Sequence, residues 1–180
     1  KRVGHAGTLD PMATGVLVIG FGYVTRLLNY IVDHHKTYEA TIRLGLRTTT
    51  EDAEGEIIEW PAEEREHVRA QIAALSREAI EQAVNTHLMG EISQVPSSYS
   101  AVKINGKHAY DLAREGKEVA LEPRQVTIDS FDVLAVHEPD AAQGTRDIDV
   151  RVACSAGTYI RALARDLGHI LGVGGYLTRL

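Results

Sequence analysis

The 180-residue sequence lacks the features of secreted, zinc-binding and membrane-spanning proteins. Its single cysteine, Cys154, excludes an internal disulfide framework and any zinc site built from several cysteines. No apolar run approaches the roughly 20 residues that a membrane-spanning helix needs. The first residues also do not follow the charged and then apolar pattern of a leader peptide. We therefore expect a soluble, cytoplasmic protein that does not bind membranes.

Other common site types are also poorly represented. His34 and His35 are adjacent, so in a strand they would point to opposite faces, and no carboxylate completes a metal-binding triad with them. Ser155 does not lie in the Gly-x-Ser-x-Gly turn of serine hydrolases. Cys154 ends an apolar stretch and fits a buried core residue better than a nucleophile. We therefore expect no metal site.

What the sequence does contain is enough apolar material for a core. Hydrophobic residues make up 44% of the chain, which excludes a disordered segment. The length fits one domain.

Charge is distributed unevenly along the chain. The net charge of −6, from 19 Lys and Arg against 25 Asp and Glu, argues weakly against nucleic acid as a partner. The acidic excess lies in two blocks, residues 51–87 with −7 and 126–150 with −5. Residues 1–50 and 151–180 each carry +3. Taken alone, this pattern is most simply explained by two solvated acidic faces.

Hydrophobic periodicity predicts both strands and helices. Alternation over residues 38–44 predicts a half-buried strand, and 126–136 and 148–154 predict two long strands joined as a hairpin. Apolar residues at helical spacing predict helices over 63–88, with Ser76 as the N-cap of a second helix, and over 157–171. The pattern indicates an α+β fold with a mixed, largely antiparallel β-sheet core flanked by helices.

The segment from Gly4 to Gly15 contains the most conspicuous carboxylate. An Asp in such a loop usually forms a turn. Asp10, however, precedes Pro11 and is therefore held extended. The apolar run 16–19 that follows predicts a buried strand, which would be a rigid base for an exposed carboxylate. A phosphate-binding loop is the rival interpretation, but the Lys-Ser/Thr ending of that motif is missing.

Two more residues have a functional interpretation beside an ordinary one. Tyr38, near the start of a predicted strand, could simply pack in the core with a solvated hydroxyl, or could form a stacking surface for a base. Arg161 falls in the first turn of the predicted helix, where cations are unfavourable. Arg161 therefore needs a specific anionic partner, either a phosphate or a carboxylate of the protein.

In their order along the chain, these segments resemble the motifs of pseudouridine synthases of the TruB type. The pattern Gly-His-x-Gly-x-Leu-Asp-Pro-x-Ala-x-Gly over residues 4–15 is highly specific to that family. The other similar segments are Lys36–Tyr38, Gln94–Lys103, Cys154–Arg161 and Gly172–Leu180. Together the matches cover nearly the whole chain.

The resemblance implies the pseudouridine synthase catalytic fold and a monomer that isomerises uridine at position 55 in the T-arm loop of tRNA, without cofactor or metal. It implies catalytic roles for Asp10, Tyr38 and Arg161. An ionised Asp10 would react in a site that excludes water, and Arg161 would offset the effect of burial on its pKa. Tyr38 would stack on the uracil. The residues implied to contact RNA or support the site are His5, Arg26, Asp52 and Leu180.

The chain departs from the family pattern mainly at its ends. The family usually has a lysine-containing motif before Lys1, and a PUA-type RNA-binding domain after the position of Leu180. We therefore expect residues 1–180 to form a single catalytic domain that lacks both flanks. Within the motifs, Ser97 occupies a position that is often proline in the family.

Two alternative functions remain at this point. One is an RNA-binding or tRNA-folding module that holds RNA without turnover. The intact set of Asp10, Tyr38 and Arg161 argues against this as the sole role. The other is a carboxylate-dependent hydrolase of small molecules on an unrelated fold.

Overall fold

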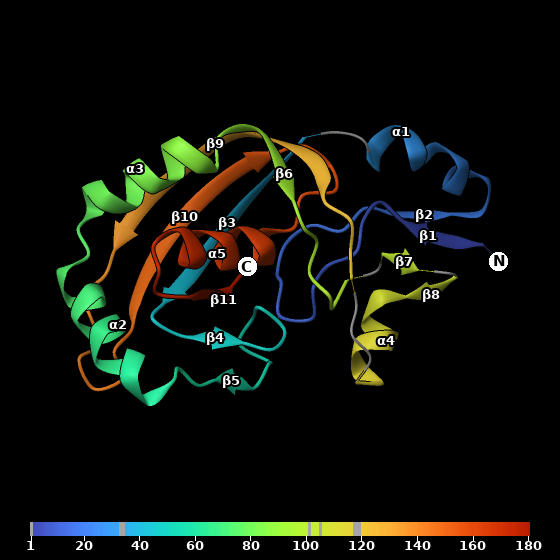
Figure 1. Ribbon diagram of the computed structural model, residues 1–180. Coiled ribbons are helices and arrows are strands. Elements are labelled where there is room, and N and C mark those ends of the chain that lie inside the picture. The colour runs from blue at the N-terminus through green and yellow to red at the C-terminus, as the bar shows by residue number, and fades with distance from the viewer. Residues whose placement is uncertain (1, 33–34, 101, 105, 117–119) are drawn as a thin grey trace.

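The computed structural model describes residues 2–32, 35–100, 102–104, 106–116 and 120–180. Lys1, His34 and Ala101, which belong to segments discussed above, lie outside these ranges. The central element is a five-stranded sheet with the order β11-β3-β10-β9-β6, in which all neighbours are antiparallel (Figure 1). Its strands are β3 (Lys36–Leu44), β6 (Gly90–Gln94), β9 (Arg124–Val136), β10 (Arg146–Cys154) and β11 (Gly175–Arg179). The predicted α+β fold with a largely antiparallel sheet is confirmed.

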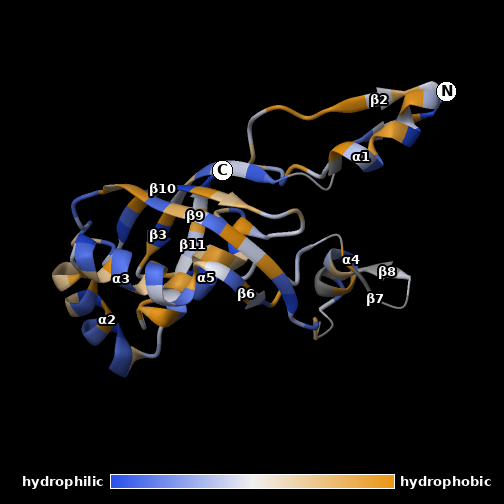
Figure 2. Ribbon diagram, turned by 90° about the horizontal axis from the view of Figure 1, so that it is seen from above, coloured by the Kyte–Doolittle hydropathy of each residue, from blue (hydrophilic) through white to orange (hydrophobic). Residues whose placement is uncertain are grey.

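Alternation of side chains decides which face of the sheet is buried. Ile42 and Leu44 of β3 are fully buried, whereas Glu39 and Arg43 point to the opposite face. The inward side chains pack with three helices, α2 (Ala62–Ala74), α3 (Arg77–His87) and α5 (Ile160–Ile170), which lie on one side of the sheet (Figure 2). The resulting core includes Ala40, Ile42, Leu44, Val68, Ile72, Ile80, Val84, Ile148, Val150, Val152, Leu163 and Leu167.

The helix ends follow their local sequence. Ser76 caps α3, since its hydroxyl accepts a hydrogen bond from the Ala79 N–H at 3.2 Å, as predicted. The helix predicted from residue 157 begins instead at Ile160, because Gly157 has a φ of +84° and turns the chain before the helix.

The N-terminal segment forms a separate small unit beside the sheet. It contains the two-stranded sheet β1 (Val3–His5) and β2 (Ile19–Phe21), the 3₁₀ helix η1 (Gly22–Leu27) and α1 (Asn29–Val32). Figure 2 shows this unit projecting from the main sheet, with an apolar chain leading into β2. The unit carries the loop between β1 and β2, which contains Asp10.

The prediction of a buried strand over residues 16–19 is wrong. Val16 is 91% exposed, and Val18 and Ile19 are also exposed. The physical reason is that β2 pairs with β1 alone, and the side chains next to this hairpin at Gly4 and Gly20 are those of Leu28 and Thr25. In the described ranges no larger apolar layer covers the run, so its hydrophobicity does not translate into burial.

Two further hairpins complete the fold. One consists of β4 (Arg47–Thr48) and β5 (Ile57–Ile58), and the other of β7 (Lys103–Ile104) and β8 (Lys107–His108), which leads into α4 (Ala109–Arg114). None of the helices in the described ranges has the length and apolar character needed to cross a membrane.

Candidate active site

The Asp10 carboxylate and the Arg161 guanidinium form a two-pronged ion pair. Arg161 Nε donates to Asp10 Oδ2 and Arg161 Nη2 donates to Asp10 Oδ1, each at 3.0 Å. Asp10 comes from the β1–β2 loop and Arg161 from the second residue of α5, so the fold joins residues 151 positions apart. This parallel geometry is the strongest form of a carboxylate–arginine contact. The two partners differ in burial, since the Arg161 side chain is 5% exposed and that of Asp10 is 27% exposed.

The remaining donors of Arg161 are also occupied. Nη1 donates to the Thr50 carbonyl at 3.1 Å and approaches the Ser97 hydroxyl at 3.5 Å, and Nη2 donates to the Tyr99 carbonyl at 2.9 Å. A guanidinium has five N–H groups in a rigid plane. Bonds in three directions therefore fix the plane of Arg161 before any substrate is present.

Asp52 supplies a second carboxylate to the same arginine. Its Oδ2 lies 3.4 Å from Arg161 Nη1, and its Oδ1 accepts bonds from the Thr50 hydroxyl at 2.5 Å and the Glu54 N–H at 3.1 Å. Asp52 is only 3% exposed. The geometry therefore makes Asp52 an internal support of Arg161, with little surface left for direct contact with RNA.

Tyr38 lies half-buried on β3 and packs against the core. Burial above all, with smaller contributions from Cys154 and the Asp10 carboxylate, raises the pKa of the Tyr38 phenol. The influence of Asp10 means that the phenol and the carboxylate belong to the same electrostatic environment. At neutral pH the Tyr38 phenol is therefore protonated and can donate a hydrogen bond.

The other residues from the family resemblance lie at different distances from this pair. The Leu180 carbonyl accepts a hydrogen bond from the Thr14 N–H at 3.0 Å, which ties the end of β11 to the loop of Asp10. His5 is exposed on β1, with its ring against the Gly7 carbonyl. Arg26 is exposed on η1. In the described part of the chain, neither His5 nor Arg26 is bonded to Asp10 or Arg161.

A second arginine on α5 extends the arrangement. Arg165 lies one turn after Arg161 and donates to Glu51 at 2.7 Å and to the Val95 carbonyl at 2.8 Å. Two successive arginines on one helix face thus hold the two successive acids Glu51 and Asp52. Sequence reasoning did not identify these contacts, because Glu51 lies 114 residues from Arg165 and the acceptor at Val95, 70 residues away, is a backbone carbonyl.

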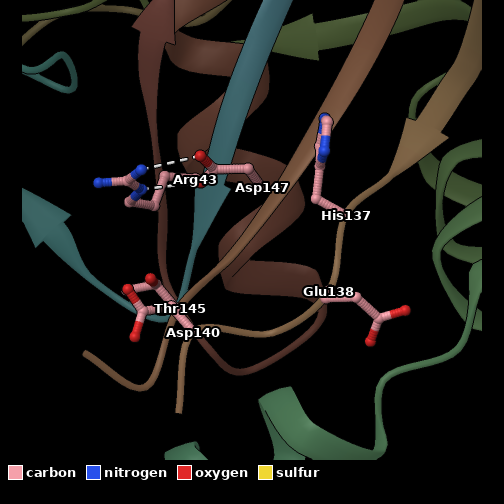
Figure 3. Close-up of a pocket in the computed structure, with 6 residues that line it drawn as sticks. All are labelled: Arg43, His137, Glu138, Asp140, Thr145 and Asp147. Carbon is pink, nitrogen blue, oxygen red and sulfur yellow. Dashed lines mark hydrogen bonds and ion pairs between the residues drawn. The ribbon is translucent and has the colours of Figure 1, made fainter. Parts of the chain in front are cut away.

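A pocket of about 250 Å³ lies elsewhere, on the sheet face opposite α5. It is lined by Arg43, His137, Glu138, Asp140, Thr145 and Asp147 (Figure 3). Arg43 and Asp147 form a two-pronged ion pair at 2.7 and 2.8 Å, so these two charges in the pocket neutralise each other. Across the residues that the structure describes, no three His, Cys, Asp or Glu side chains are grouped to hold a metal ion.

The sequence matches the family described as TruB family pseudouridylate synthase (N terminal domain) over residues 1–160. Proteins named tRNA pseudouridine synthase B from Arthrobacter sp. (strain FB24) and Bifidobacterium longum subsp. infantis are 57% and 56% identical to it. Each alignment covers 100% of this chain, but 55% and 54% of the respective relative. The chain thus spans about half the length of these curated relatives.

Solved structures have a similar fold. The crystal structure of a Cbf5-Nop10-Gar1 complex contains a chain that is 26% identical, with a TM-score of 0.65, and the match covers 99% of this chain and 39% of that one. An H/ACA RNP bound to a substrate RNA containing 2′-deoxyuridine gives a TM-score of 0.61 at 24% identity. That match covers 99% of this chain and 37% of the other, and it concerns the fold alone.

Proposed function

The chain belongs to the TruB family of pseudouridylate synthases, and from this premise we propose that it converts uridine to pseudouridine in tRNA. The proposed target is position 55 in the T-arm loop, and the reaction uses the Asp10 carboxylate and no cofactor. The observation that carries this proposal is the two-pronged contact between Asp10 and the buried Arg161.

The reaction is an isomerisation. The bond from the ribose to N1 of uracil breaks, the base turns, and a bond from the ribose to C5 forms while a proton leaves C5 and N1 becomes protonated. An ionised Asp10 can attack either the base or the sugar, and both routes need the carboxylate to stay charged in a site that excludes water. The two parallel hydrogen bonds from Arg161 place a fixed positive charge against this carboxylate and favour its charged form.

The uracil must leave its stack to reach Asp10. Tyr38 then stacks on the base, and its protonated phenol is available as a proton donor. We assign His5 to the space that the flipped nucleotide leaves in the RNA loop, because its side chain is exposed at the start of the Asp10 loop. We assign Arg26, also exposed, to contact with phosphate. Asp52 and Leu180 support the site from within.

A monomer suffices for this reaction, because one chain supplies Asp10, Tyr38 and Arg161. We propose that residues 1–180 act as one catalytic unit. The alternative of a hydrolase on an unrelated fold is contradicted by the family match. In a module that only binds RNA, the partly exposed Asp10 carboxylate would repel the RNA phosphates and weaken binding. This argues against RNA binding as the only role.

The test is to incubate the chain with an unmodified T-arm stem-loop and to map pseudouridine by chemical labelling. A matched stem-loop with cytidine at the target position is the control. We expect modification of the single target uridine and none in the control. Binding without turnover would support the RNA-binding module instead, and modification at another uridine would contradict the proposed position.

A further inference from the structure

Gln94 is a buried polar side chain that contacts the chain two residues before Arg161. It is the last residue of β6 and is 1% exposed. Its amide makes two bonds to the backbone of one residue, since Nε2 donates to the Tyr159 carbonyl at 3.1 Å and Oε1 accepts from the Tyr159 N–H at 2.9 Å. Tyr159 is the N-cap of α5 and makes no side-chain cap bond of its own.

The two bonds fix the start of α5 against the edge of the sheet. Core packing of Ile160 and Leu163 holds the body of the first turn, and the paired donor and acceptor of one amide set the position and direction of the Tyr159 backbone before it. A buried amide without partners is unfavourable, so Gln94 holds the backbone of Tyr159 strongly. Arg161 follows Tyr159 by only two residues, so the anchored backbone lies immediately before the arginine.

The segment that follows Gln94 holds the arginines themselves. The Val95 carbonyl accepts from Arg165, and the Ser97 hydroxyl and Tyr99 carbonyl accept from Arg161. One short stretch of chain therefore contacts both the helix start and the guanidinium. Asp10, by contrast, belongs to the projecting N-terminal unit, and Arg161 is the group that holds its carboxylate.

We propose that Gln94 is a positioning residue of the active site, which sets the place of the Arg161 guanidinium and thereby the place at which the Asp10 carboxylate is held. Its kinetic consequences depend on the proposed function. A displacement of about 1 Å can lower a rate about 100-fold without changing the identity of any reacting group.

The variant that tests this is Gln94→Met, which keeps a similar shape and removes both bonds. We expect the single-turnover rate of pseudouridine formation to fall about 10- to 100-fold, while the Kd for the T-arm stem-loop stays within about threefold. The single-turnover rate of Gln94→Glu should fall at least as far. Its carboxylate can still accept from the Tyr159 N–H, but it cannot donate to the Tyr159 carbonyl and repels that oxygen. The matched control is Gln71→Met on α2, which should leave both quantities unchanged.

A loss of rate could also arise from general destabilisation. Ile80→Val is the control for this effect, because Ile80 lies in the core on α3, away from the site, and its truncation lowers the free energy of unfolding. Below its melting temperature this variant should retain the wild-type rate. If Gln94→Met loses activity only in proportion to its unfolded fraction, or loses RNA affinity as much as rate, the positioning role is overturned.

A readout without RNA separates this inference from the proposed function. In ¹⁵N-edited spectra, the Arg161 Nε–H, assigned by its absence in Arg161→Lys, should exchange slowly in the wild type and rapidly in Gln94→Met. Unchanged protection in Gln94→Met would overturn the positioning role even in an active enzyme. If the wild type makes no pseudouridine, the proposed function fails, and the exchange rates still decide whether Gln94 positions Arg161.

Discussion

In the proposed reaction the Asp10 carboxylate would act beside RNA, and the cation that contacts it in this protein is Arg161. The neutral variant Asp10→Asn keeps the size of the side chain. We expect it to fold and bind the stem-loop like the wild type and to form no detectable pseudouridine. The measurement is chemical labelling of the RNA, with Asp132→Asn, an exposed substitution on β9, as the control that stays active. Turnover by Asp10→Asn would refute the assignment.

Arg161→Lys preserves the charge and removes the fork. A lysine cannot donate two parallel hydrogen bonds to the Asp10 carboxylate and also reach the Thr50 and Tyr99 carbonyls. We expect at least about a 100-fold lower single-turnover rate and a loss of about 2–4 kcal/mol in the free energy of unfolding, because buried acceptors lose their donor. Arg151→Lys, which changes an exposed pair with Glu39, should change neither quantity noticeably. A near-wild-type rate for Arg161→Lys would argue against the Asp10 pairing.

Tyr38 offers a test by pH. Its pKa is raised from the ordinary value of 10.0, so the protonated phenol persists to higher pH than in an exposed tyrosine. We expect the wild-type rate to show no loss from Tyr38 deprotonation below about pH 10. Tyr38→Phe keeps stacking and removes the proton, and should lower the rate about 10- to 100-fold. A normal rate in Tyr38→Phe would mean that the hydroxyl has no essential role.

At the residue scale, the sequence identified the side chains that carry recognisable chemistry. Arg161 stood out because a cation is unusual in the first turn of a helix, and its partner proved to be a carboxylate of the protein. The catalytic role of that pair stays a prediction. Gln94 could not be identified, because its partners are backbone groups that leave no pattern in sequence. The carbonyls of Thr50 and Tyr99 are invisible to sequence reasoning for the same reason.

Among the elements, α5 and β11 approach unusually closely. A Cβ added at Gly168 would lie 2.2 Å from the backbone of Gly174 and Gly175. Gly168→Ala should therefore destabilise the protein by about 3 kcal/mol, despite the gain of up to about 1 kcal/mol in helix propensity. Thermal or denaturant unfolding measures this, with His169→Ala on the same helix as the control. An unchanged or higher melting temperature in Gly168→Ala would contradict the close packing.

The elements themselves could be predicted where one face is buried. The alternation over β3 and the apolar stripe of α5 gave the right element types, because each buries one side against the core. The prediction of a buried strand around Val16 was wrong for the opposite reason. Its residues are apolar but have no layer of the described chain above them, and composition alone does not indicate whether such a layer exists.

For the whole molecule, the distribution of charge matters more than its sum. Helices α2 and α3, from the acidic block 51–87, lie at the end of the molecule away from the N-terminal unit (Figure 1). We expect RNA to bind a surface made by the basic ends of the sequence. Raising salt from about 50 to 200 mM should weaken binding about tenfold, as for about two phosphate contacts. Affinity measured across this range is the test, and a flat response would contradict a basic RNA-binding surface.

The 151-residue separation of Asp10 and Arg161 also has a consequence for the order of synthesis. Translation proceeds from the N-terminus, so at about 5–20 residues per second the carboxylate is made roughly 8–30 s before its arginine. During that interval Asp10 sits in a loop without its cation, and the sheet that supports α5 is still incomplete. If the pair catalyses the proposed reaction, we expect a nascent chain to become able to modify RNA only after Arg161 has left the ribosome and folded against Asp10.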